Sequence, residues 1–452
     1  MSQAYINEEW KVEYVKGSLS LSEEIFSLRE ETFVNEKCIM NSRNVRAESD
    51  QTGWHVLIRN ISDNILLAAV HVLPATLADV EANQSNNSIL NSSTIYAKRA
   101  AIKKQYRAKG LLQLLIYSLI RIYPEHEYLI FHLQDLNSPI RKFTKAIPAT
   151  EFKSKIIEDI DNPIELTPFI TRTESAMVNC FDKMDENTRV IARKMIFDDI
   201  NAKLEGYIDD FHCHNFWTKL KNHTLTKNEY LSILMDMHQY VRMTTRTLAL
   251  AAAYSESRDL RNFYIHHLKE EVDHEKILEA DISYLGEDVD YLIHSRPMCK
   301  AARTITSLGE SVISYRQQPE MYLAVPFLLE GLAGSIEESH LSSIVSCIKS
   351  WGVKSPRKAA NMLISHAGFD GGHDGHHLLD QKMIQVEINT ERKKRELLAN
   401  MDIVFLSLSE IFDPKSIFND ISQVEDANIL SNPLLENVYQ TPEVTLFQNQ
   451  GV

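Results

Sequence analysis

The sequence has few cysteines, and none of them is placed for local pairing. Its five cysteines, at positions 38, 180, 213, 299 and 347 of 452, are widely separated, and no two form a Cys-x-x-Cys motif. This argues against a disulfide framework and against the common short redox and zinc motifs. We therefore expect reduced thiols in a cytoplasmic protein.

The chain also lacks long apolar runs and an excess of positive charge. Its first residues, MSQAYINEEWKVEY, contain no apolar signal core, and no stretch reaches about 18 uninterrupted apolar residues, so we expect no membrane span. The formal net charge of −14 argues against a general nucleic-acid-binding protein, because such proteins usually carry a basic surface. We expect a small molecule as the binding partner. The oligomeric state stays open, with a homodimer among the options.

Two kinds of sequence pattern follow one another along the chain. Mixed strand and helix signals, including a hairpin at 53–75, a strand at 127–134 and a helix after Gly110, predict a small α+β domain at the N-terminus. Later segments repeat with the period of a helix, which predicts an all-α domain. The predicted parts are 1–150 (α+β domain), 151–185 (mixed connector), 186–415 (helical domain) and 416–452 (loosely packed tail). We expect helices at 187–207, 227–254, 258–285, 298–316, 321–333, 337–350, 355–380 and 381–412.

The stretch SHAGFDGGHDGHH, residues 365–377, combines histidines and aspartates with four glycines. His366, Asp370 and His373 are spaced at i, i+4 and i+7, so in a helix they share one face. Two imidazoles and a carboxylate suit iron, manganese or zinc. The glycines weaken a helix, but they let a neighbouring helix or a substrate approach closely. The alternative is a loop with solvated histidines.

Two other stretches supply further candidate ligands. Glu271 and His274 in HHLKEEVDHEKILEAD have the Glu-x-x-His spacing of di-iron helix bundles, or else they form a solvated helix face. Glu330 lies in the apolar run VPFLLEGLAGSI, where an unpaired carboxylate is costly to bury, unless it lies on a polar face or at a helix end. Together the three stretches can hold two metal ions. The candidate metal ligands are Glu271, His274, Glu330, His366, Asp370 and His373.

These stretches resemble a known family. FYIHHLKEEVDHEKILEADISYLG, LLEGLAG and HAGFDGGH resemble the Glu-x-x-His, Leu-Glu-Gly and His-x-x-x-Asp-x-x-His motifs of heme-oxygenase-like di-iron oxidases and oxygenases. MHQYVRMTTRTLALAAA is similar to the first core helix of that family. The resemblance covers about 190–415. It implies a helical bundle with two Fe(II) ions that activates O2 to oxidise a small amine, amino-acid or fatty-acid substrate.

Carried over to this chain, the resemblance makes Glu271 and Glu330 bridging or terminal carboxylates, and the other four candidates complete the ligand set. Many relatives have a further carboxylate on the first core helix, where this chain offers His238 and Gln239. The resemblance therefore leaves one metal site to be filled by His238 or built differently. His376 and His377 are spare ligands.

The N-terminal part resembles a second family. EEIFSLREETFVNEK, a hairpin and AAIKKQYRAKGLLQLL are similar to GNAT N-acyltransferases, in particular the branch that makes acyl-homoserine lactones and N-acyl amino acids. In that fold an Arg-x-x-Gly-x-Gly/Ala loop opens a helix whose N–H groups hold the pyrophosphate of CoA. The match implies that Arg107, Lys109 and Gly110 bind an acyl-CoA, with Leu112 in place of the last small residue. The alternative is a solvated charge run before a helix.

The predicted protein is thus a multidomain enzyme, with an α+β GNAT-like domain before an all-α heme-oxygenase-like bundle. Its predicted activity is that of a non-heme di-iron oxidase or oxygenase, bifunctional if the N-terminal domain is an active acyltransferase; no catalytic base is assigned. One alternative is a non-catalytic metal-binding or effector module with a degenerate acyltransferase domain. Another is an acyltransferase with a structural helical appendage.

Overall fold

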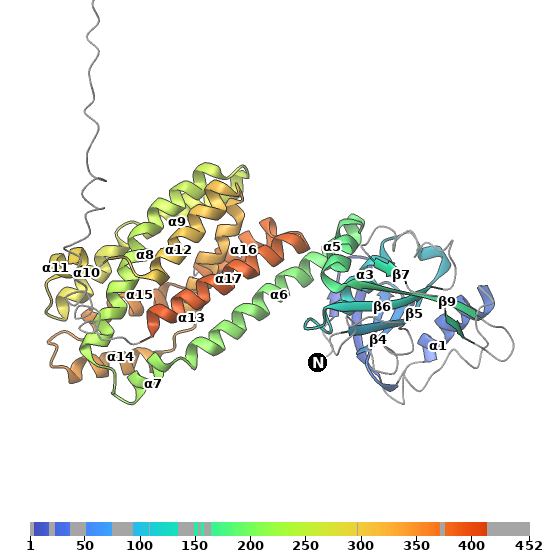
Figure 1. The fold of residues 1–452 in the computed structure, drawn as a ribbon, viewed down its shortest axis with the longest axis horizontal. Helices are drawn as coiled ribbons and strands as arrows, with labels where there is room; N and C mark the ends of the chain where they lie inside the picture. The colour runs from blue at the N-terminus through green and yellow to red at the C-terminus, as the bar shows by residue number, and fades with distance from the viewer. Residues whose placement is uncertain are drawn as a thin grey trace, which may run out of the picture.

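The computed structural model of the chain describes residues 4–17, 23–36, 51–74, 94–107, 109–133, 149–151, 155–157, 164–295, 297–370 and 376–413. Figure 1 shows a region built around a sheet and a second region built from helices, with α6 (Glu186–His212) running from one into the other. An α+β part followed by a helical part is the predicted fold class, which is therefore confirmed.

The N-terminal region is organised around one mixed sheet. Its strand order is β1-β2-β3-β4-β5-β6-β9-β7, with β8 paired to β9. Strands β5 and β6 are parallel, and the other neighbouring strands are antiparallel. The strands are β1 (Ala4–Ile6), β2 (Trp10–Lys16), β3 (Trp54–Asn60), β4 (Leu66–Pro74), β5 (Thr94–Ile102), β6 (Tyr128–Leu133), β7 (Ala149–Glu151), β8 (Lys155–Ile157) and β9 (Ile164–Arg172). Strand β9 lies within residues 151–185, which the sequence predicts to be a mixed connector.

The predicted hairpin at 53–75 is confirmed as β3 and β4. The Oδ1 atom of Asn60 accepts a hydrogen bond from the N–H of Ser62, and Asn64 takes a left-handed φ of 58°, which asparagine tolerates in turns. Successive side chains of a strand point to opposite faces. Val56 accordingly joins the core that contains α3 (Leu111–Ile120), while Leu57 joins the core that contains α1 (Glu23–Arg29).

Helices make up the rest of the described chain after β9. They are α5 (Thr173–Asp182), α6, α7 (Asn215–Lys221), α8 (Lys227–Tyr254), α9 (Arg258–Glu271), α10 (His274–Tyr284), α11 (Val289–Ser295), α12 (Lys300–Glu310), α13 (Ala324–Gly334), α14 (Glu338–Ser350), α15 (Asn361–Asp370), α16 (His376–Glu387) and α17 (Glu391–Phe412). Short π and 3-10 turns lie at η1 (Glu30–Glu36), η4 (Lys104–Tyr106), η5 (Ser311–Tyr315), η6 (Pro319–Leu323) and η7 (Lys358–Ala360).

Local signals in the sequence explain several helix ends. Helix α8 begins with a capping box, in which the hydroxyl of Thr226 accepts a hydrogen bond from the N–H of Glu229 and the carboxylate of Glu229 accepts one from the N–H of Thr226. The predicted helix at 258–285 is wrong in one respect, because it is divided into α9 and α10. The predicted helix at 381–412 is likewise divided between α16 and α17.

A largely buried ionic network joins the sheet region to the helices. Nε of Arg121, just after α3, lies 3.1 Å from Oδ1 of Asp199 in α6, and Nζ of Lys394 in α17 lies 2.8 Å from the other oxygen of Asp199. Nζ of Lys394 also lies 2.9 Å from Oε2 of Glu391, which accepts a hydrogen bond from the hydroxyl of Tyr117. Glu391 is 1% exposed. Acidic and basic groups therefore neutralise one another where the two regions meet.

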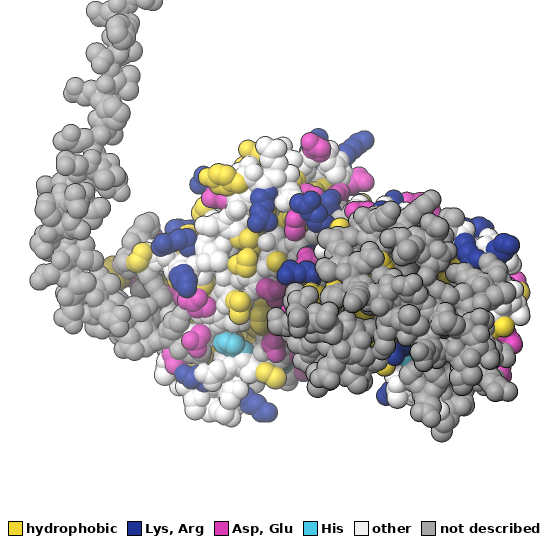
Figure 2. Space-filling view, turned by 45° about the vertical axis from the view of Figure 1, so that its right-hand side comes forward, with side chains coloured by type: hydrophobic (Ala, Val, Ile, Leu, Met, Phe, Trp, Pro, Cys, Tyr) yellow, Lys and Arg dark blue, Asp and Glu magenta, His cyan; other side chains and the backbone are white. Residues whose placement is uncertain are grey.

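The surface of the described residues carries charges of both signs. Figure 2 shows acidic and basic side chains interspersed on one face, with hydrophobic side chains between them. None of the helices in the part of the chain that the structure describes is both long and apolar enough to cross a bilayer. No disulfide joins the cysteines at 180, 213, 299 and 347.

Candidate metal centre

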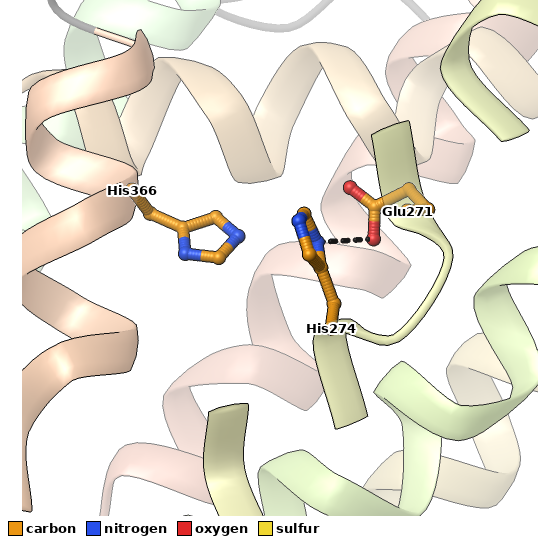
Figure 3. A group of neighbouring side chains, drawn as sticks. All are labelled: Glu271, His274 and His366. Atoms are coloured by element: carbon orange, nitrogen blue, oxygen red, sulfur yellow. Dashed lines mark hydrogen bonds and ion pairs between the residues drawn. The ribbon is translucent and has the colours of Figure 1, made fainter. Parts of the chain in front are cut away.

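Glu271, His274 and His366 come together in the helical region (Figure 3). One ligating atom of each lies within 4.8 Å of the others. Nδ1 of His274 is 2.9 Å from Oε2 of Glu271, and the rings of His274 and His366 are 5.0 Å apart at an angle of 72°. The three side chains come from the consecutive helices α9 and α10 and from α15, which is distant from them in sequence.

A break between α9 and α10 sets the position of His274. Helix α9 ends at Glu271, and Asp273 takes a left-handed φ of 71° before α10 begins at His274. The chain turns at this point, and the imidazole of His274 faces the carboxylate of Glu271 across the turn (Figure 3). The Glu-x-x-His pair therefore does not lie on one continuous helix, which is where the sequence pattern predicts it.

A second cluster contains His267, Glu330 and Asp380, from α9, α13 and α16. One ligating atom of each again lies within 4.8 Å of the others, and all three residues are buried. Nε2 of His267 is 3.0 Å from Oε1 of Glu330. The same nitrogen is 3.7 Å from Oε1 of Glu271, in the first cluster. The two clusters are therefore neighbours, linked by His267.

Close helix packing brings Glu330 to this position. A Cβ atom on the next residue, Gly331, would lie 2.9 Å from Cδ2 of Leu204 and 3.2 Å from Cε1 of His377. Contacts this short require a shift of the neighbouring side chains, so glycine lets α13 approach α6 and α16 closely. In the Leu-Glu-Gly sequence, Glu330 is the candidate ligand, and the next residue, Gly331, is small enough for α13 to pack closely against α6 and α16.

Hydrogen bonds with backbone groups fix both the ring of His366 and the helix that carries it. Its Nδ1 lies 2.8 Å from the carbonyl oxygen of Met362, so this nitrogen carries the proton and donates it. The carboxylate of Asp281, which is fully buried, accepts hydrogen bonds from the N–H groups of Asn361 and Met362 at the start of α15. Asp281 therefore fixes the start of the helix that carries His366. Because Nδ1 of His366 carries the proton, the lone pair on its Nε2 stays available as a ligand.

Burial and neighbouring charges shift the pKa values of the acids and imidazoles in the clusters. Burial opposes ionisation of Glu271, but hydrogen bonds with His267 and His274 lower its pKa well below the usual range. Burial likewise opposes the charged form of His267, yet the carboxylates of Glu271 and Glu330 raise its pKa well above the ordinary value. Burial lowers the pKa of His366, which favours its neutral, ligating form. The carboxylates on either side of His267 therefore favour its protonated form when no metal is bound.

Glu330 is a buried acid with little hydrogen-bond compensation. It is 7% exposed, and neither of its oxygens accepts a well-aligned hydrogen bond from a described residue, although His267 is close. A buried carboxylate without hydrogen bonds is costly. Together with imidazole nitrogens at coordination spacing, it offers a cation an anionic site of the kind that iron, manganese or zinc prefers.

The structure thus places four of the six predicted ligands. Glu271, His274 and His366 lie in the first cluster and Glu330 in the second. Asp370 is the last residue of α15, but its side chain is outside the described part of the structure, as is His373. The metal-binding roles of all six residues stay predictions, and the glycines at 371, 372 and 375 are equally outside the described part.

Among the spare histidines, two have described side chains. Nε2 of His238 lies 3.2 Å from Oε1 of Glu279, and the pair belongs to neither cluster. The ring of His377 stacks on Phe327 at 5.1 Å, and its Nε2 lies 3.0 Å from Nε2 of Gln381. The side chain of His376 is outside the described part.

Sequence reasoning missed His267 and Asp380. His267 lies four residues before Glu271, one helical turn away, and this spacing was a readable signal in HHLKEEVDH. Asp380 follows two leucines and is fully buried. Its only local signal is a carboxylate beside apolar residues, and its partners come from helices distant in sequence.

The predicted acyl-CoA residues lie at the start of α3. Gly110 is the N-cap of this helix with a φ of 73°, no side chain caps the helix, and Lys109 lies over the ring of Tyr106. Nε of Arg107 donates to the carbonyl of Ile102. A Cβ atom on Gly110 would lie 2.8 Å from Oγ1 of Thr188 in α6, so both backbone conformation and packing already require glycine there.

Comparisons with known proteins find similarity in solved structures. No protein-family model matches the sequence, and no curated protein matches it. A domain of unknown function with a heme oxygenase-like fold from Shewanella denitrificans is 16% identical with a TM-score of 0.41, covering 50% of this chain and 94% of its own. A TenA homolog from Pseudomonas syringae is 12% identical with a TM-score of 0.38, covering 49% and 90%.

An acetyltransferase is also among the similar structures. The ribosomal-protein-S18-alanine N-acetyltransferase from Escherichia coli is 8% identical with a TM-score of 0.26, covering 36% of this chain and 94% of its own. Each of these structures matches only part of the chain. An acetyltransferase of the GNAT family from Bacillus anthracis is 11% identical with a TM-score of 0.27, covering 38% of this chain and 99% of its own. Structures described as heme oxygenase-like and as GNAT are thus both among those to which the chain is similar.

Proposed function

We propose that the helical region is a non-heme di-iron oxidase or oxygenase that acts with O2 on a small organic substrate. The observation that carries this proposal is the presence of two neighbouring clusters of ligating side chains, linked through His267. Imidazole and carboxylate donors suit iron. When bound, two ferrous ions supply the electrons that reduce dioxygen. The ligands in the described residues are Glu271, His274 and His366 in one site and His267, Glu330 and Asp380 in the other.

The side chains of the two clusters have distinct tasks in this proposal. The three carboxylates bring negative charge into the helical region and offset most of the charge of two divalent cations. His267 releases its proton when it ligates, because only the neutral imidazole offers a lone pair. His366 needs no such change, since its Nδ1–H is held by Met362 and its other nitrogen is available.

The surroundings of the clusters favour a reaction in a site from which water is largely excluded. Met362 and Leu363 line a cavity together with Glu271, Glu330 and His366. An apolar wall beside the ligands limits the access of water and strengthens electrostatic interactions within the site. A substrate in this cavity would lie directly against both clusters.

Iron content and oxygen consumption test the proposal. Metal-free protein loaded anaerobically with Fe(II) should bind two ions per chain, and it should consume O2 when oxygen is admitted. The variant His267→Ala should lose at least one ion, since this residue belongs to one cluster and touches the other. His266→Ala is the matched control, because His266 is the next residue but its side chain is 58% exposed and pairs with Glu270.

The outcomes separate the enzyme from a binding module. Iron binding with O2 consumption that depends on His267 supports the oxidase. Stable iron binding without O2 consumption supports a non-catalytic metal-binding or effector module instead. If the wild type binds no iron, or if His266→Ala and His267→Ala lose iron equally, the proposed centre is rejected.

We propose as a second function that the N-terminal region binds an acyl-CoA-type donor. The uncapped N-terminus of α3, with Arg107 and Lys109 nearby, favours a phosphate group there. Calorimetry with CoA tests this function independently of iron. Lys109→Ala should weaken binding several-fold, while Lys203→Ala, at an exposed position in α6, should leave it unchanged. If the wild type does not bind CoA, the second proposal is rejected, and the N-terminal region is left with a structural role beside the helical region.

A further inference from the structure

One cavity lies against both clusters and extends well beyond them. His267, Glu271, Glu330 and His366 form part of its wall. Its volume is about 120 Å³, whereas a single water needs roughly 10–15 Å³. The cavity therefore has room for an organic molecule as well as dioxygen.

The remaining wall is long and largely apolar. Met237, Val241, Thr244 and Leu248 line it from one face of α8, at spacings of three or four residues. The distance along the helix from the first to the last of these residues is about 16 Å, at ~1.5 Å per residue. Val325, Leu329 and Ala333 line it in the same way from α13. The cavity is therefore elongated along two helices.

The threonine side chains of this wall use their hydroxyl hydrogen atoms within the protein. The hydroxyl of Thr247 donates to the carbonyl of Met243 at 3.0 Å, and that of Thr306 donates to the carbonyl of Ala302 at 3.0 Å. The hydroxyl of Thr244 faces the carbonyl of Tyr240 in the same i to i−4 pattern. These hydroxyl groups therefore offer few hydrogen-bond donors to a ligand.

Charged side chains occur at one part of the wall alone. Among the described residues that line the cavity, the acids and histidines are the four that belong to the clusters, and there is no lysine or arginine. A charged group placed elsewhere in the cavity would lose its hydration without gaining a counter-charge. An apolar group there would gain the free energy of leaving water.

We propose that the cavity binds the apolar acyl or alkyl chain of the substrate, with a single polar end at the metal clusters. This inference rests on the proposed oxidase function and specifies its substrate class. It selects a chain-bearing substrate over a free amino acid or a diamine, because the latter two carry a second charged group. The chain lies along α8 and α13, and its polar end is the part presented to the ligands.

Binding to the metal-free protein tests the substrate class without any need for activity. Hexanamide, octanamide and decanamide should bind with affinities that rise about threefold to fourfold per methylene, the effect of burying each CH2 group. Octane-1,8-diamine and octanedioic acid should bind at least ~10-fold more weakly than octanamide, because one charged end enters the apolar part. Affinities that do not depend on chain length, or tight binding of the doubly charged compounds, would overturn the inference.

A pair of variants locates the binding site. Ala333→Phe fills the cavity from α13 and should weaken decanamide binding at least ~10-fold, because an overfilled site excludes the ligand. Ala253→Phe is the matched control, since Ala253 is an exposed residue of α8 that does not line the cavity. Equal binding by both variants counts against the site. If Ala333→Phe does not fold, the chain-length series on the wild type decides alone.

Iron content measured on the same samples keeps the two proposals apart. If the protein takes up no iron but its binding of the amides depends on chain length, the site for an apolar chain is supported and the oxidase proposal is rejected. If the protein binds two iron ions but its affinity for the amides does not depend on chain length, the oxidase proposal is supported and this substrate class is rejected.

Discussion

Two buried groups of charged side chains differ in the cations that they contain. Between the regions, Asp199 and Glu391 lie beside Arg121 and Lys394, whose charges persist at any physiological pH. In the candidate metal centre, Glu271 and Glu330 lie beside imidazoles, which are charged only while they hold a proton. The network between the regions is thus complete within the protein. The centre depends on a proton or a metal ion to balance its acids.

The largest expected effect comes from breaking the network between the regions. Lys394→Met leaves the buried carboxylate of Glu391 with less compensation, so the free energy of unfolding should fall by about 3–5 kcal/mol. Urea denaturation measures this change. The control Lys203→Met removes an exposed pair with Asp402 in α17 and should cost about 1 kcal/mol or less. Equal losses in the two variants would mean that burial does not distinguish these ion pairs.

Metal-dependent stability sharpens the comparison. A metal that binds only the folded protein should stabilise the wild type by about 2.7 kcal/mol at a free concentration one hundred times Kd. Glu330→Gln should remove most of this gain, because it deletes an anionic ligand-type side chain of the second cluster. Thermal unfolding with and without Mn(II) provides the measurement. Lys394→Met should keep the metal-induced gain, and its loss there would contradict the separation of the two groups.

Asp281 provides a third kind of buried acid, because its described partners are backbone N–H groups. Burial raises its pKa to about 7, and the N–H groups of Met362 and Asn361 oppose the rise. Since the folded-state pKa lies above the ordinary value of 3.8, the contribution to stability is fully present below about pH 4 and is lost as the pH rises through about 7.

The expected result is a pH-dependent difference between two proteins. From about pH 5 to pH 8, the unfolding free energy of the wild type relative to Asp281→Asn should fall by about 2 kcal/mol. Urea denaturation across this range measures it. Parallel pH profiles for the two proteins would show that Asp281 does not titrate in this interval.

The smallest expected effect concerns a hydrogen bond at the edge of the network. Tyr117→Phe removes the 2.8 Å hydrogen bond from the tyrosine hydroxyl to Glu391, which should cost about 1.5 kcal/mol because the acceptor is charged. The loss should be the same with a chelator and with added metal. A metal-dependent loss would indicate that the two groups of charges are coupled.

Elements with local signals were predictable from the sequence. Helix α8 has the predicted bounds because its capping box and its apolar period lie within its own residues. The β3–β4 hairpin carries its turn residues in the same way. The sequence predicts a connector where β9 lies, because its partner β6 lies more than thirty residues earlier. Pairing over such a distance leaves no local pattern.

The candidate centre was predictable to the extent that single helices carry its residues. The spacing of Glu271 and His274 and the apolar surroundings of Glu330 pointed to side chains that the structure brings close together. His267 and Asp380 were missed because their proximity to Glu330 comes from the packing of three helices. The break after Glu271 was missed because Val272 and Asp273 include neither glycine nor proline, the usual signals for a helix end.

The left-handed backbone at Asp273 offers a criterion for reading other sequences. Asparagine and glycine adopt this conformation readily, whereas valine, isoleucine and proline do so only at high cost or not at all. A chain with one of the latter at this position cannot form the same turn, even if it keeps the glutamate and the histidine. Homologues can therefore be sorted at this single position into those able to build a bent pair of ligands and those restricted to a straight one.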